Sequence, residues 1–136
     1  MAAIPMPTSP DVAATIARIA LGALFLVHGV PKMRNLKGTA GWVKSTGFPG
    51  GGGFAILFSI LESFGAAALI AGFFTQIVAV LFVLEMVATS IFSKTKLGKK
   101  FVLGYELDVA YLVLALTLAI LGPGPWSVDR WLGLTP

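Results

Sequence analysis

The sequence predicts an all-α integral membrane protein whose four spans form a helical bundle in a single domain, residues 1–136. Two features of the composition support this: 57% of the residues are hydrophobic and only 12% are charged, whereas a soluble domain has about 25% charged residues. In addition, the apolar residues gather in runs of about 20, and a helix of that length crosses the roughly 30 Å of bilayer hydrocarbon. The predicted spans are residues 12–30, 54–73, 75–92 and 104–121.

The first span is bounded by a polar residue and a proline. Asp11 is a suitable N-cap, and Pro31 lacks an N–H group, so the helix is expected to kink or end there. Residues 36–43 follow and predict a short interfacial helix, in which Trp42 lies at the level of the lipid headgroups.

Glycine and short turns bound the other spans. The run of glycines at residues 50–53 is not expected to be helical, because glycine loses the most conformational freedom on folding. Small residues fill the second half of the second span, which predicts close packing against a neighbouring helix. The turn before the third span is too short to cross the membrane, so the third span runs antiparallel to the second. The sequence Gly-Pro-Gly-Pro at residues 122–125 ends the fourth span.

Basic residues are concentrated in the two connections that follow the first and third spans. Because Lys and Arg are retained on the cytoplasmic side, this pattern predicts a multi-pass protein of the cell membrane with cytoplasmic basic loops and both termini outside. The same residues account for the net charge of +4 through contact with lipid headgroups, so no nucleic-acid partner is expected. These basic residues are Lys32, Arg34, Lys37, Lys44, Lys94, Lys96, Lys99 and Lys100.

Ionisable residues inside the spans are candidate functional residues, because each costs about 3 kcal/mol at the membrane centre and needs a partner. At about 1.5 Å per residue, Glu62 and Glu85 both lie roughly 15 Å from the outer ends of their helices. Arg18 lies roughly 10 Å from the start of the first span by the same rise, within side-chain reach of either glutamate. These depths predict a cluster in which Arg18 neutralises one carboxylate and the other stays protonated.

A second polar cluster is predicted at a deeper level, near the cytoplasmic face. It consists of His28, Lys32, Tyr105 and Glu106. For Lys32 an alternative is that the side chain extends to the lipid headgroups. Asp108 lies two residues, or about 200°, beyond Glu106 on the fourth helix and is therefore expected to point elsewhere.

These polar groups have two interpretations. In the first they are structural and fix the register of the helices. In the second they form a proton relay or a ligand site, which is the usual meaning of ionisable residues inside a membrane. A membrane quinone suits such a site, since its headgroup needs hydrogen-bond donors and a proton route and its tail needs an apolar cleft. Passage of protons or solutes is a further alternative, and no catalytic residue is assigned.

Several other classes of site are not expected. The chain has no cysteine, which excludes disulfides and thiolate metal sites. A two-metal site in a helical bundle needs Glu-x-x-His pairs, and the single histidine, His28, has no such glutamate. The glycine run lacks the strand and helix that a nucleotide-binding loop requires. No metal or nucleotide is therefore expected in this chain.

The ordered set of residues resembles the DoxX family of small four-span membrane proteins over nearly the whole chain. Glu85 lies outside this pattern. In chain order the matching residues are Arg18 with Gly22, His28-Gly29 and Lys32, Gly47-Phe48-Pro49, Glu62 with Gly65, Gly72 and Thr75, Gly104-Tyr105-Glu106, and Gly122-Pro123-Gly124 followed by Ser127 and Asp129.

The resemblance implies a four-helix membrane bundle linked with redox chemistry. Some relatives are a subunit of thiosulfate:quinone oxidoreductase, which oxidises thiosulfate to tetrathionate and reduces a membrane quinone. Others are described as partners that recruit soluble enzymes to the membrane. The expected function is therefore that of a quinone-linked redox subunit, with electrons carried by another membrane or peripheral subunit. The alternative is a non-catalytic assembly or anchor subunit that recruits or stabilises partner proteins.

Overall fold

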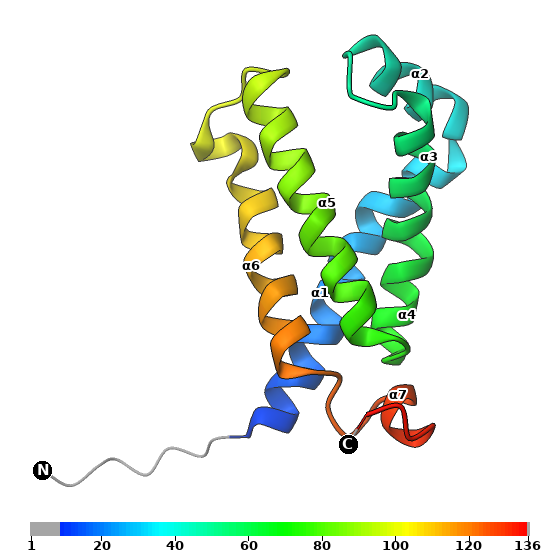
Figure 1. Cartoon of the computed structure of the whole chain (residues 1–136), viewed down its shortest axis with the longest axis vertical. Helices are drawn as coiled ribbons and strands as arrows, with labels where there is room; N and C mark the ends of the chain where they lie inside the picture. The colour runs from blue at the N-terminus through cyan, green and yellow to red at the C-terminus, as the bar shows by residue number, and fades with distance from the viewer. Residues whose placement is uncertain (1–8, 136) are drawn as a thin grey trace, which may run out of the picture.

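A computed structural model describes residues 9–135 of the chain. Within this range the regular structure is helical and there is no strand, and four helical stretches are long and apolar enough to cross a membrane. They pack as a bundle (Figure 1), so the predicted all-α membrane bundle is confirmed. The four stretches are Pro10–Arg34, Gly52–Ala71, Thr75–Thr95 and Phe101–Leu121.

Two of the four stretches contain a short π-helical segment. The second stretch is α3, η1 and α4 in succession, and the fourth is η2 followed by α6. The helices and π-helical segments are α1 (Pro10–Arg34), α2 (Leu36–Ser45), α3 (Gly52–Ile60), η1 (Leu61–Gly65), α4 (Ala66–Ala71), α5 (Thr75–Thr95), η2 (Phe101–Tyr105), α6 (Glu106–Leu121) and α7 (Val128–Trp131).

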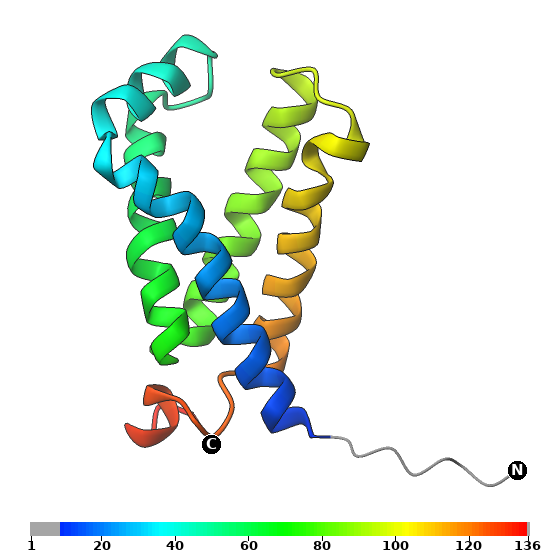
Figure 2. The same ribbon diagram turned by 180° about the vertical axis from the view of Figure 1, so that it is seen from behind.

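The bundle has two distinct ends. The start of α1 and the short helix α7 lie at one end, here called the α7 end (Figures 1 and 2). Helix α2 and the connection between α5 and α6 lie at the other. We call this the basic end, because Lys37, Lys44, Lys96, Lys99 and Lys100 all lie there.

Three predicted helix boundaries differ from the structure. Ser9, rather than Asp11, is the N-cap of α1, and its side chain accepts a hydrogen bond from the Val12 amide. Helix α1 also continues through Pro31 to Arg34, because a proline removes only one backbone hydrogen bond and the next turn can still form. Helix α3 begins at Gly52, so part of the glycine run is helical.

Helix α1 crosses the second stretch at glycine positions. A Cβ atom added to Gly29 would lie 2.5 Å from the carbonyl carbon of Glu62, and one added to Gly22 would lie 2.7 Å from the carbonyl oxygen of Ala66. Close backbone approach between membrane helices depends on such small residues. Gly29 therefore places the end of α1 directly against η1.

We expect Gly29→Ala to lower the free energy of unfolding by about 1–3 kcal/mol, the usual effect of overpacking, because backbone atoms cannot move aside as a side chain can. Titration of the reconstituted protein with a denaturing detergent, followed by circular dichroism, measures the change. Gly41→Ala in α2 is the matched control, since a Cβ there meets nothing within 4 Å. Equal stability of the two variants would contradict the close packing of α1 on η1.

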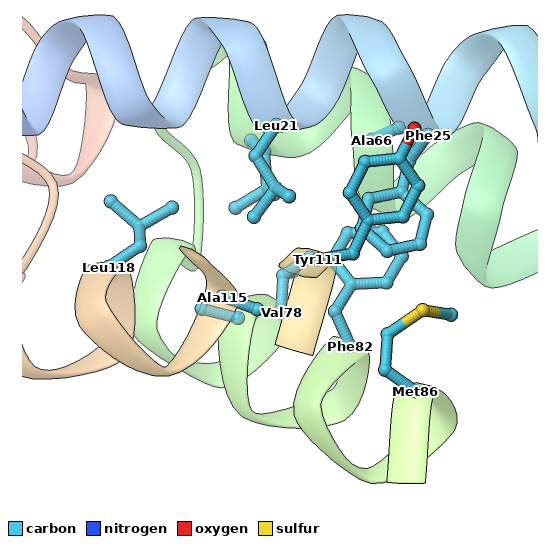
Figure 3. Close-up of a cluster of buried hydrophobic side chains, with 11 residues drawn as sticks. Leu21, Phe25, Ala66, Val78, Phe82, Met86, Tyr111, Ala115 and Leu118 are labelled. Carbon is cyan, nitrogen blue, oxygen red and sulfur yellow. The ribbon is translucent and has the colours of Figure 1, made fainter. Parts of the chain in front are cut away.

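The core lies between α1, α4, α5 and α6 (Figure 3). Its centre is a stacked pair of rings, Phe25 and Phe82, whose centroids are 3.8 Å apart, with Tyr111 tilted against Phe25 at 5.3 Å. Large apolar side chains such as Val27, Leu84 and Ile120 are exposed on the outer faces of the helices. This inversion of the soluble pattern is what a bundle surrounded by lipid requires.

Candidate functional site

An ion pair joins α1 to the π-helical segment η1 inside the bundle. The Lys32 Nζ atom donates to both carboxylate oxygens of Glu62, each at 2.7 Å. Glu62 is only 3% exposed, whereas 39% of the Lys32 side chain is accessible. Segments of π-helix occur frequently at functional sites. The pair therefore combines a buried anion with a cation that a ligand can still reach.

A small cavity of about 110 Å³, here called the polar pocket, lies beside this ion pair. The Tyr111 hydroxyl and His28 Nε2 are 3.4 Å apart in it, at hydrogen-bond distance. Asp108 and Thr89 face the pocket from α6 and α5. The full lining is Phe25, His28, Lys32, Glu62, Met86, Thr89, Leu107, Asp108 and Tyr111.

A larger cleft of about 510 Å³ lies between α1, α2 and α3 on one side and α5 and α6 on the other. Most of its walls are apolar, and they include Trp42, Phe48 and Phe92. The cleft and the polar pocket share the lining residues Lys32, Thr89 and Asp108. An apolar cleft at the basic end of the bundle thus ends at a group of hydrogen-bonding side chains.

Glu85 is a second buried acid, on α5. It is 2% exposed, and no group among residues 9–135 donates a hydrogen bond to either of its carboxyl oxygens. Among the other acids, Glu62 acts on Glu85 more strongly than Asp108 does.

The predicted position of Arg18 is wrong, because Arg18 does not join the two glutamates. Its guanidinium donates to backbone carbonyl oxygens at the α7 end: Leu69 at 2.9 Å, Pro123 at 3.2 Å, Trp126 at 2.7 Å, and Ile70. A guanidinium carries five donors in a fixed plane, and this arrangement suits several converging carbonyl groups better than one carboxylate. Lys32 provides the cation for Glu62 instead.

The second predicted cluster is also only partly correct. His28 and Lys32 line the polar pocket, but Tyr105 and Glu106 do not. Glu106 accepts a hydrogen bond from the Leu103 amide at 2.9 Å, and the Tyr105 ring packs on Phe101. Both side chains therefore stabilise the start of α6.

Sequence reasoning missed Asp108, Thr89 and Tyr111. A signal for the first and last of these exists in the spacing of α6. Asp108 and Tyr111 continue at steps of three and four residues into the buried positions Ala115 and Leu118. This helical periodicity marks the inward face of α6. Glu106, about 200° from Asp108, lies off that face.

The DoxX family model matches residues 13–95, which is more than half of the chain. The chain belongs to the DoxX family. The match includes the ion pair, Glu85 and much of the cleft.

Curated relatives of this DoxX protein match most of its length. Inner membrane protein YphA of Escherichia coli (strain K12) is 33% identical over 85% of this chain and 86% of its own. Inner membrane protein YqjF of the same strain is 32% identical over 90% of this chain and 93% of its own. "Putative oxidoreductase CatD" of Bacillus subtilis (strain 168) is 30% identical over 96% of this chain and 90% of its own. No solved structure gives a significant match. The four spans and these relatives together indicate a multi-pass membrane protein.

Proposed function

We propose that this DoxX protein binds the headgroup of a membrane quinone at the polar pocket and serves as a membrane subunit in quinone-linked redox chemistry. The observation that carries the proposal is the ion pair of Lys32 and Glu62 at the inner end of an apolar cleft. A ligand pocket is typically apolar with a few placed polar groups. The similarity to a relative whose name includes oxidoreductase agrees with a redox role.

The donors at the pocket match a quinone headgroup. A quinone carries two carbonyl oxygens, which accept hydrogen bonds and gain protons when the ring is reduced. The Lys32 ammonium and the Tyr111 hydroxyl are donors on the pocket wall, and the Asp108 carboxyl can exchange a proton there. These residues bind and orient the ring, while the electrons come from a donor outside this chain.

A lateral route is available for the lipophilic tail. Phe48, Phe58 and Phe92 line the cleft and also line an outer groove of about 340 Å³ between α3 and α5. Exposed apolar side chains, including Phe54 and Ile91, complete that groove. Because these three aromatic residues line both the cleft and the outer groove, we propose that an isoprenoid tail passes between their rings.

We propose thiosulfate as the electron donor. Two thiosulfate ions joined into tetrathionate release two electrons, and a quinone takes up two electrons and two protons to become a quinol. We place the basic end in the cytoplasm, because the lysines of that end follow the positive-inside pattern. The proposed site then opens from the cytoplasmic half of the membrane.

Fluorescence of Trp42, which lines the cleft, tests the proposal. We would titrate decylubiquinone into nanodiscs that contain the Trp126→Phe/Trp131→Phe variant, in which Trp42 is the remaining tryptophan. Saturable quenching of Trp42 is expected, beyond the linear quenching caused by partition into lipid. The comparison is the Trp42→Phe variant of the wild type, whose fluorescence comes from Trp126 and Trp131. Quenching of Trp42 that stays linear and equals the quenching of this variant overturns the proposal. If the protein shows no saturable quenching but co-purifies with other subunits, the assembly role is favoured instead.

Tyr111→Phe is expected to raise the Kd of this quenching about fivefold, because one hydrogen bond contributes about 1 kcal/mol. The variant removes only the hydroxyl that faces the polar pocket, so the core packing of the ring is kept. Tyr105→Phe is the matched control, since Tyr105 is outside the pocket. Equal Kd values for the two variants would contradict a headgroup site at Tyr111.

A further inference from the structure

Glu85 is a buried acid that neither the pocket nor the cleft uses directly. It projects from the middle of α5 and is absent from the described linings of both cavities. The charged groups of the described chain that act on it are Glu62 from η1, Lys32 from α1 and Asp108 from α6. Of these three groups, Glu62 is the one within hydrogen-bonding reach of Glu85 when one of the two carboxyls carries a proton.

The two buried glutamates, Glu62 and Glu85, do not each have a cation to neutralise them. Glu62 and Glu85 are two buried carboxyls, and Lys32 is the one cation bonded to either of them within residues 9–135. An ionised carboxylate without donors in a low-dielectric interior is very unfavourable, whereas the neutral acid is tolerated. Both oxygens of Glu85 lack a donor, while Glu62 holds the Lys32 ammonium. The extra proton of the pair therefore belongs on Glu85.

We propose that Glu85 and Glu62 form a proton-binding site, in which Glu85 stores a proton and delivers it through Glu62 to a ligand beside Lys32. The delivery step rests on the proposed quinone function, whereas the storage of the proton does not. In the step, Glu85 gives its proton to the Glu62 carboxylate and becomes a carboxylate itself. Glu62 then passes this proton to an oxygen of the quinone that the external donor has reduced, and a proton from the cleft later restores Glu85.

Infrared spectroscopy of the full chain in quinone-free nanodiscs tests the storage of the proton. A protonated carboxyl has a C=O stretching band that shifts in heavy water, and a carboxylate does not. The wild type is expected to show this band near neutral pH. Glu85→Gln should lose it, and Glu85→Asp should keep it at a shifted position. The matched control Glu106→Gln removes a glutamate at the start of α6 and should leave the band unchanged.

Absence of the band from the wild type overturns the proposal without any variant having to fold. Persistence of the band in Glu85→Gln also overturns it, because the proton would then belong to another carboxyl. Neither outcome depends on quinone binding, so failure here is distinguishable from failure of the Trp42 titration.

Redox-induced difference spectra test the delivery step. When bound decylubiquinone is reduced electrochemically in the nanodiscs, the Glu85 band should decrease transiently in the wild type. In Glu62→Gln the band should be present and should not change, because the connection to the pocket is cut. An unchanged band in the wild type during quinol formation, or an equal decrease in Glu62→Gln, overturns the relay.

Discussion

Arg18→Met is expected to open the α7 end of the bundle and to lower the free energy of unfolding by about 3 kcal/mol or more. The guanidinium holds the last turn of α4, through Leu69, to the segment after α6, through Pro123 and Trp126. Methionine fills a similar volume but donates no hydrogen bond. The buried carbonyl groups are then left without donors, which is more costly than the loss of the bonds themselves.

Two measurements separate a local effect of this variant from global unfolding. Detergent titration followed by circular dichroism gives the change in unfolding free energy, and the fluorescence of Trp126 and Trp131 reports on the α7 end. Arg130→Met is the matched control, because Arg130 is exposed on α7. Equal stability of the two variants would show that the carbonyl contacts of Arg18 do not hold this end together.

The fold was predictable because two conditions restrict it strongly. Each span must match the thickness of the bilayer, and every backbone polar group inside the bilayer must be hydrogen-bonded within the protein. Four apolar runs of about 20 residues have few alternatives to a helical bundle in lipid. The boundaries were less predictable, since the effect of Pro31 depends on whether the next turn can still form. The continuation of α1 past Pro31 matters for the site. It puts Lys32 on the last turn of α1, where its side chain reaches back to Glu62.

The site was only partly predictable because depth along a helix does not specify direction around it. Depth placed Arg18 within reach of Glu62 and put Lys32 in a separate cluster, whereas the structure pairs Lys32 with Glu62. The π-helical segment η1 also changes the direction of Glu62 relative to a regular helix, and nothing in the local sequence indicates that segment. On α6, by contrast, the buried periodicity would have selected Asp108 instead of Glu106.

Lys32→Met is expected to destabilise the protein and to abolish quinone binding. The variant leaves the Glu62 carboxylate buried without its cation, and breaking a buried pair in this way costs about 3–5 kcal/mol. Since 39% of the Lys32 side chain is exposed, water screens part of the interaction, and a loss of about 2–3 kcal/mol is expected. Lys37→Met on α2 is the control, because Lys37 forms no ion pair in the described chain.

The double variant Lys32→Met/Glu62→Leu separates a structural pair from a functional one. Removing both charges eliminates the buried unpaired anion, so we expect most of the stability lost in Lys32→Met to return. Saturable quenching of Trp42 by decylubiquinone should not return, because the ligand has lost its donor and its proton route. A double variant that is stable and still binds the quinone would show that the pair serves packing alone. A variant that is stable but does not bind would show that this ion pair is retained for the ligand, at a position where apolar side chains suffice for folding.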